Sequence, residues 1–114
     1  MIQEYRFGKM VIEGQSYDKD LIIASGKVIP NWWRNKGHNL QVADIEKVIE
    51  QHQPEMVVVG KGQFGMMSIS DEVRQFLHER GIELVDKKTG KAVQIYNTHF
   101  NSGRNVIGAF HLTC

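Results

Sequence analysis

The chain has 114 residues, of which 41% are hydrophobic and 24% charged, so it has the size and composition of one globular domain and not of a disordered chain. Fourteen basic against thirteen acidic side chains leave a net charge of +1, which argues against a nucleic-acid binder that works by neutralising phosphates. No apolar run approaches the ~20 residues of a membrane span. The first residues resemble neither a secretory signal nor a transit peptide. We therefore expect one cytoplasmic domain over residues 1–114, with no nucleic acid and no membrane among its partners.

The first 30 residues predict short antiparallel strands. Four runs have strand composition, at residues 2–7, 9–13, 20–24 and 27–29. The turn candidates between them are Gly14-Gln15 and Ser25-Gly26. These connections are too short for parallel crossovers, so the runs are expected to pair as hairpins.

A loop from Pro30 to Asn39 follows, and helices then alternate with strands. Hydrophobic periodicity predicts three helices, near residues Val42–Gln51, Asp71–Arg80 and Gly90–Ser102. Ser70 and Thr89 are the candidate N-caps of the second and third helices, and Gly81 has the C′ position of the second. Strands are predicted at Met56–Gly60, Ile82–Asp86 and Val106–Leu112. This alternation predicts an α/β sheet with at least one covered face.

The run Gly60-Lys61-Gly62-Gln63-Phe64-Gly65 is a G-x-G-x-x-G sequence directly after a buried strand, with Asp86 at the end of the next one. In dinucleotide sites the helix begins inside the glycine run, whereas here the only good cap is Ser70. Two other interpretations stay open. The run is a turn that leaves the sheet, or its backbone N–H groups bind a small anion beside Lys61.

Two adjacent tryptophans, Trp32 and Trp33, precede Arg34 and are followed by His38. Adjacent loop residues point in different directions, so one tryptophan is expected to pack on the sheet and the other to lie at the surface. Tryptophan and arginine are enriched among the anchors of protein interfaces, which favours a partner surface here. The alternative is that both tryptophans cap the core.

The sequence contains neither the residue spacing of a zinc site nor a known catalytic motif. No pair has the spacing C-x-x-C or H-x-x-x-H, and no G-x-S-x-G run occurs, so we assign no metal, no cofactor and no catalytic residue. Cys114 is interpreted as a bystander, because a redox role needs a lowered thiol pKa. The five histidines are His38, His52, His78, His99 and His111.

Three motifs together resemble the Mth-domain family: Val57-Val58-Val59-Gly60-Lys61-Gly62, Trp33-Arg34 with the downstream His38, and the run from Gly108 to Cys114. Their order and spacing cover nearly the whole chain. The family includes an animal adipogenesis-associated protein and the third assembly factor of mitochondrial complex I. Its eukaryotic members are tied to assembly and regulation, and no enzymatic activity is established for them. Without a mitochondrial presequence, a role in complex I assembly is not expected for this chain.

The resemblance implies a three-layer α/β fold with an N-terminal β layer. Its central mixed sheet has five strands in the order 2-1-5-3-4, and the last strand is antiparallel to the others. The usual rule for connections would instead make the strands at 82–86 and 106–112 parallel. On this point we follow the family.

The leading functional hypothesis is a non-catalytic binding or assembly module with a pocket at the glycine run. The alternative is a small enzyme, or a nucleotide- or anion-binding protein, that uses residues 60–65. The expected ligand-binding residues are Gly60, Lys61, Gly62, Gln63, Arg34 and His111. The expected partner surface is Trp32, Trp33 and His38, and weak self-association through a tryptophan is plausible. Two simpler interpretations stay open, in which Lys61 is only solvated and Arg34 pairs with a helix acid such as Asp44.

Overall fold

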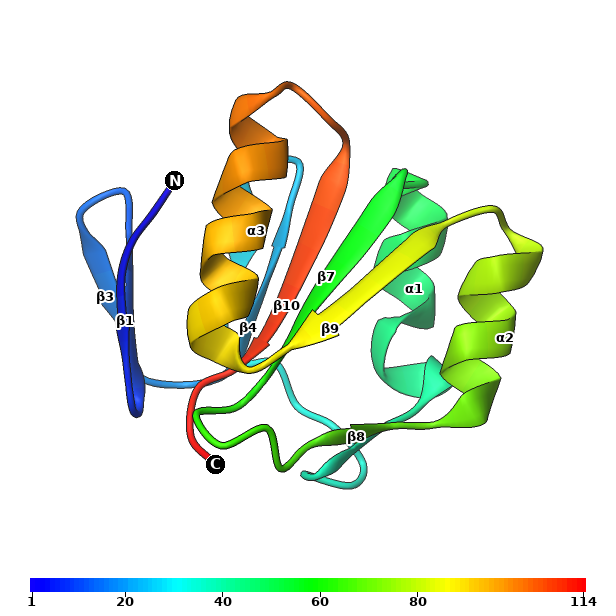
Figure 1. The fold of residues 1–114 in the computed structure, drawn as a ribbon, viewed down its shortest axis with the longest axis horizontal. Coiled ribbons are helices and arrows are strands. Elements are labelled where there is room, and N and C mark those ends of the chain that lie inside the picture. Colours follow the sequence, from blue (N-terminus) through cyan, green and yellow to red (C-terminus); the bar gives the residue numbers. More distant parts are fainter.

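A mixed five-stranded sheet forms the middle of the computed structural model, which describes residues 1–114 (Figure 1). The strand order across this sheet is β5-β4-β10-β7-β9, which in chain order is the predicted 2-1-5-3-4. The strands are β4 (Leu21–Ala24), β5 (Lys27–Ile29), β7 (Met56–Lys61), β9 (Glu83–Lys87) and β10 (Val106–His111). Only β4 runs against the other four.

The direction of β10 corrects the expectation taken from the family. β10 is not antiparallel to the other strands: it pairs in parallel with β7, from Val106 opposite Met56 to His111 opposite Lys61. The reason is the connection, since the chain leaves β9, returns along a helix and enters β10 in the same direction. The connection rule predicts this direction correctly, and only the direction of the last strand expected from the family is wrong.

Three helices form at the predicted places, and they cover both faces of the sheet. They are α1 (Val42–His52), α2 (Asp71–Glu79) and α3 (Thr89–Asn101). Helices α1 and α2 lie on one face, and α3 lies on the other (Figure 1). Ser70 caps α2 as predicted, because its hydroxyl accepts a hydrogen bond from the Val73 N–H, and Gly81 follows the helix with a φ of 68°.

The N-terminal β layer is a separate antiparallel sheet of β1 (Ile2–Arg6), β2 (Lys9–Ile12) and β3 (Gln15–Tyr17). It packs beside α3, where the Asn97 side chain exchanges hydrogen bonds of 3.0 and 2.8 Å with the backbone of Ile2. Strand β3 was not expected, because Gln15 was assigned to the turn. The turn is instead made at Glu13 and Gly14, both with positive φ.

Alternation along the central strands divides the core into two parts. Val57 and Val59 of β7 face α1 and α2, whereas Met56 and Val58 face α3 and the N-terminal sheet. All four are at most 2% exposed, which is why this strand is apolar on both sides. None of the three helices has the length and apolar character to cross a membrane.

Two loops that were expected to lack strands pair with each other. β6 (Asn39–Leu40) and β8 (Ser68–Ile69) form a short parallel ladder, and the Asn39 side-chain amide donates to the Ser68 hydroxyl at 2.8 Å. This ladder joins the tryptophan loop to the segment that follows the glycine run. Both loops are thereby held at the carboxyl end of β7.

Candidate functional site

The loops that carry the expected site residues gather at the carboxyl edge of the parallel strands, the lower end of the view in Figure 1. Open α/β sheets bind ligands at this edge. Because β10 is parallel to β7, His111 lies in register with Lys61. The structure therefore brings these two predicted residues to neighbouring positions of one edge.

Asp20, Arg34 and His111 form a cluster of polar side chains at this edge, here termed the buried cluster. Oδ2 of Asp20 lies 2.8 Å from Nη2 of Arg34 and 2.7 Å from Nδ1 of His111. Oδ1 of Asp20 accepts a hydrogen bond of 2.8 Å from the backbone N–H of Leu112. The side chains of Arg34, His111 and Asp20 are only 4%, 7% and 16% exposed. An ion pair this deeply buried is strongly destabilising to break, since the remaining charge has no water to solvate it.

The electrostatics of the buried cluster favour an ionised Asp20. Burial by itself would raise the pKa of this carboxyl group, but the hydrogen bonds from His111, from the Leu112 backbone and from Arg34 outweigh burial. The pKa of Asp20 is therefore lowered from its ordinary value of 3.8. The carboxylate in turn holds the His111 ring by Nδ1, which directs Nε2 away from it.

Two nitrogens of the buried cluster have no hydrogen-bond partner. They are Nη1 of Arg34 and Nε2 of His111, and both are inaccessible to solvent. The rest of the Arg34 guanidinium is engaged: Nε and Nη2 donate to the Gly37 carbonyl at 3.1 and 2.8 Å. Buried polar atoms are nearly always paired, so two unpaired ones in one cluster mark a place where a further hydrogen-bonding group could fit. Nη1 of Arg34 can only donate, whereas Nε2 of His111 donates only when the ring carries both protons.

Trp32 is the tryptophan that packs inward. Its indole N–H donates to the Asp44 carbonyl at 3.0 Å, and the Arg34 guanidinium lies 4.6 Å from the centre of its ring. Arg34 does not pair with the Asp44 carboxylate, which accepts instead from the backbone N–H groups of Asn35 and Gln41 at the start of α1. The interpretation that Arg34 pairs with a helix acid is therefore wrong, because its partner is Asp20.

A second cluster at this edge, here termed the outer cluster, is formed by side chains from β7, α2 and β9. Its members are Lys61, Arg74 and Asp86. Oδ2 of Asp86 lies 3.2 Å from both Nζ of Lys61 and Nη2 of Arg74. Burial alone would raise the pKa of Asp86, but hydrogen bonds from Arg74 and Lys61 lower it. Lys61 is thus paired and not merely solvated. This pairing also occupies Asp86, the acid that would hydrogen-bond the ribose in a dinucleotide site.

The glycine run holds the C-terminal residues of the chain. The N–H groups of Gln63 and Met66 donate to the carbonyls of Thr113 and Cys114, at 2.6 and 3.0 Å. Gly62 has a φ of 97°, and a Cβ at this position would lie 2.5 Å from the Cys114 backbone. The N–H groups of Gly62 and Gly65 are also bonded within the chain. These amides, which were expected to bind an anion, already have partners.

Thr89 links the glycine run to β10. Its hydroxyl donates to the His111 carbonyl at 2.6 Å and accepts from the Gly62 N–H at 2.8 Å. Thr89 was expected to cap α3, but it is the first residue of that helix, and its side chain points to the strand ends instead. Gly60 makes room for it, because a Cβ there would lie 2.8 Å from the Thr89 hydroxyl. Close packing thus explains both Gly60, near the end of β7, and Gly62, directly after it.

Large hydrophobic side chains are exposed around the same edge. There are five of them, and all lie in or next to loops at this end of the molecule. This group is here termed the apolar rim and consists of Phe7, Ile29, Trp33, Phe64 and Met66. Trp33 is 74% exposed, and the rings of Phe7 and Phe64 lie 6.3 Å apart. His38 is also exposed, and its ring meets the edge of the His111 ring at 5.6 Å. The expected partner-surface residues therefore divide, with Trp33 and His38 outside and Trp32 inside.

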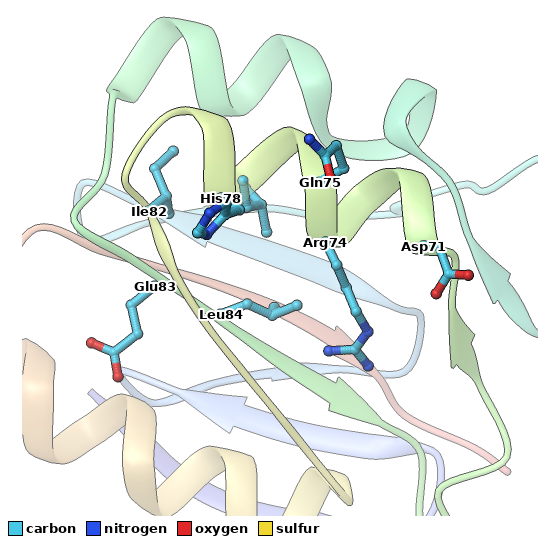
Figure 2. Close-up of a pocket in the computed structure, with 8 residues that line it drawn as sticks. Asp71, Arg74, Gln75, His78, Ile82, Glu83 and Leu84 are labelled. Atoms are coloured by element: carbon cyan, nitrogen blue, oxygen red, sulfur yellow. The ribbon is translucent and has the colours of Figure 1, made fainter.

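A separate pocket of about 490 Å³ lies between α2 and the edge strand β9 (Figure 2). Figure 2 shows Leu84 on β9 and Ile82 in the turn before it, with Arg74 of α2 reaching toward the carboxyl end of the strand. The polar residues of its lining carry both charge signs, with Asp71 and Glu83 against Arg74. None of the residues expected at a site lines this pocket.

Asp20 and Thr89 are two residues of this edge that the sequence did not identify as site residues. A signal for Asp20 was present, because the expected strand order already placed the strand predicted at residues 20–24 beside the last strand. Pairing those strands antiparallel brings Asp20 next to His111 and Leu112. No comparable signal pointed to Thr89, since a threonine before a helix is more simply a cap.

Comparison with known proteins gives a family and several similar folds. A family model described as a protein of unknown function (DUF498/DUF598) matches residues 2–111. The solved structure of a conserved hypothetical protein from Pyrococcus horikoshii is 25% identical with a TM-score of 0.85, covering 100% of this chain and 99% of that one. A structure named MT938 is 24% identical, with a TM-score of 0.81 and coverages of 100% and 98%. A Bordetella pertussis protein described as a Mth938-like domain is 18% identical, with a TM-score of 0.65 and coverages of 98% and 85%. These findings agree with the resemblance drawn from the motifs.

Proposed function

The chain belongs to the DUF498/DUF598 family, and from this premise we propose that it is a non-catalytic cytoplasmic module that binds a protein partner through the apolar rim. One observation carries the proposal. All five exposed large hydrophobic side chains lie at one end of the molecule, although the three sheets and three helices offer surface in every direction. Exposed apolar side chains that gather in one region mark interaction sites, whereas scattered ones need no explanation.

The rim has the composition of an interface centre. Trp33 and the Phe7–Phe64 pair are large aromatic groups, which supply most of the binding energy where partners meet. The backbone position of Trp33 is fixed on both sides. Its neighbours Trp32 and Arg34 are held by a hydrogen bond to α1 and by the ion pair of the buried cluster. A rigid support lowers the entropy cost of binding.

The test compares three versions of the chain. The rim variant carries Trp33→Ser, Phe64→Ser and Met66→Ser. The control variant carries Lys27→Ser, Glu79→Ser and Asn101→Ser, three exposed positions at the opposite end. Proteins captured from a native lysate on the wild type are purified, and their affinities for all three are measured by calorimetry. We expect a partner whose affinity falls about tenfold or more for the rim variant and is unchanged for the control. A partner that binds the rim variant as tightly as the wild type contradicts the proposal.

A second copy of the chain is one partner that the same surface could bind weakly. Trp33 is the side chain to change, because Trp32 is half-buried and bonded to α1. Sedimentation velocity of the wild type beside Trp33→Ser is expected to show concentration-dependent association only for the wild type. A wild type that stays monomeric up to high concentration removes this form of the proposal.

We propose a second candidate function, binding of a small anion at the buried cluster, because Arg34 Nη1 and His111 Nε2 are both buried and unpaired. An anion would accept from Nη1, and from Nε2 when the imidazole carries both protons. Lys61 and the glycine amides contribute less than expected, since Asp86 and the chain's own carbonyls engage them. A nucleotide site at the run is disfavoured further because α2 begins only at Asp71.

A thermal-shift screen with phosphate, sulfate and small carboxylates tests this candidate against a matched chloride control. A bound anion stabilises the fold by ~2.7 kcal/mol at a hundredfold excess over its dissociation constant. We expect the gain for the wild type and for Lys61→Ala, but not for Arg34→Ala. If no anion raises the melting temperature beyond chloride, the unpaired nitrogens do not form an anion site.

A further inference from the structure

A second pocket at the carboxyl edge has a charge pattern unlike that in Figure 2. It has a volume of about 460 Å³ and lies where the end of β1, the glycine run and the start of α3 meet. Its lining includes three basic side chains and no acidic one: Tyr5, Arg6, Phe7, Gln63, Lys88, Gly90 and Lys91. The pocket in Figure 2 mixes acids with bases. Of these two pockets, the one at α3 therefore has the lining of a single charge sign that favours an anionic occupant.

The positive charge of this pocket is poorly neutralised within the chain. Lys88 and Lys91 make no ion pair, and Arg6 has only an exposed contact of 3.4 Å with Glu4. The first turn of α3 carries no acidic residue, whereas those of α1 and α2 do. The stem of Lys88 lies close to Gly65, with its Cγ 3.3 Å from where a Cβ of that glycine would be. The Lys88 side chain thus packs beside the glycine run, whose Gln63 also lines the pocket.

One aromatic side chain of the apolar rim lines the same pocket, and a second lies against it. Phe7 is part of its lining, and Phe64 follows Gln63 directly and lies against Phe7 with a ring separation of 6.3 Å. Phe7 is 54% exposed and Phe64 is 62% exposed. The basic pocket and the exposed aromatic rings beside it therefore offer ionic and apolar contacts close enough together for one short peptide to make both.

We propose that this pocket binds an acidic segment of the protein partner, with a carboxylate among Arg6, Lys88 and Lys91 and an adjacent apolar side chain against Phe7 and Phe64. The proposal rests on the proposed partner-binding function and names the partner's chemistry. Charge complementarity is the argument, because complementary charges steer and orient a partner while aromatic contacts supply affinity. The concave shape favours a protruding side chain over the flat surface of an anionic membrane.

The test uses a displayed library of random twelve-residue peptides, selected on the immobilised wild type. Enriched peptides are synthesised, and their affinities are measured by fluorescence anisotropy at low and at high salt. The charge-reversal variant is Lys88→Glu with Lys91→Glu. The matched control is Lys27→Glu with Lys47→Glu, which changes the net charge equally at exposed positions outside the pocket. Trp33→Ser and Phe64→Ser are measured beside them.

We expect enriched peptides to place Asp or Glu next to Phe, Leu or Trp. Their affinity should fall about tenfold or more for the charge-reversal variant and for Phe64→Ser, stay within about twofold for the control, and weaken with salt. Basic or neutral peptides, or acidic ones that bind the charge-reversal variant normally, overturn the inference. Peptides that lose binding only with Trp33→Ser leave the proposed function standing and overturn this inference alone. Vesicles of phosphatidylserine that bind the wild type in place of any peptide would assign the pocket to a membrane surface and also overturn it.

Discussion

The buried and the outer cluster are built from the same chemistry at the same sheet edge. In each, one carboxylate oxygen lies within 3.2 Å of two basic side chains. They differ in burial: the Arg34 side chain is 4% exposed, whereas Lys61 and Arg74 are 27% and 49% exposed. Burial makes a broken ion pair costly, whereas solvent and salt screen an exposed one. The geometry of an ion pair alone therefore does not determine how much the pair stabilises the fold.

Removing the cation of the buried cluster is expected to have the largest effect. Arg34→Met should lower the free energy of unfolding by about 3–5 kcal/mol, because Asp20 then stays buried with one fewer partner. Urea unfolding measures this loss. The double variant Arg34→Met with Asp20→Asn should lose less than the two single losses combined, since both act on one pair. Strict additivity would show that the two side chains do not depend on each other.

The carboxylate of the buried cluster gives a pH-dependent version of the same comparison. Asp20→Asn should cost about 3 kcal/mol near pH 7, since it removes the negative charge and keeps the shape. A carboxyl group with a lowered folded-state pKa binds fewer protons when folded, so its stabilisation is full above the unfolded pKa, about 4, and is lost as pH falls through the folded pKa. The difference between wild type and variant should therefore shrink below pH 4. A difference that is constant from pH 7 to pH 2 would exclude the charge as its cause.

Substitution of Thr89, which links the ends of β7 and β10 by hydrogen bonds, is expected to have an intermediate effect. Thr89→Val keeps the volume but removes the bonds to the His111 carbonyl and the Gly62 N–H. Leaving such buried groups unpaired should cost about 2 kcal/mol. Thr89→Ser retains the hydroxyl and is the matched control in the same urea series. A loss for Thr89→Val no larger than that for Thr89→Ser would contradict the assignment of the effect to the two hydrogen bonds of the hydroxyl.

The outer cluster is expected to give the smallest effect. Lys61→Met should change the free energy of unfolding by no more than about 1 kcal/mol, because solvent screens its pair with Asp86 and Arg74 remains as a partner. Raising the salt concentration should reduce even this difference, whereas the Arg34→Met loss should hardly change. A loss for Lys61→Met that matches that of Arg34→Met would remove the distinction between the clusters.

Most of the fold could be predicted because its signals are local. The capping serine at Ser70, the glycine at Gly81 and the apolar run at 56–60 each depend on neighbouring residues, and the structure places them as expected. The short ladder between β6 and β8 could not be predicted, since two-residue strands leave no periodic pattern. The direction of β10 was predicted correctly by the connection rule and wrongly by the family resemblance.

The candidate site was predictable only in part, because its contacts join residues far apart in the chain. Arg34 and His111 were chosen for their side-chain chemistry, and the structure brings them within 3.2 Å of each other. Their common partner Asp20 is 91 residues from His111 and carries no motif. The amides of the glycine run looked free because the sequence does not show that the C-terminal residues return to them.

The middle strand of the central sheet is also the last strand in the chain. β10 separates the β4–β5 hairpin from β7 and β9, and it makes the only ladders that join those two halves. During synthesis, the ribosome thus releases residues 106–111 after every other strand has emerged. Until then, β4 and β7 each present an unpaired edge, the feature of a sheet that most readily pairs with other chains. The sheet can close only once residues 106–111 are available to pair, so these two edges stay open for longer than in a sheet built from one end to the other.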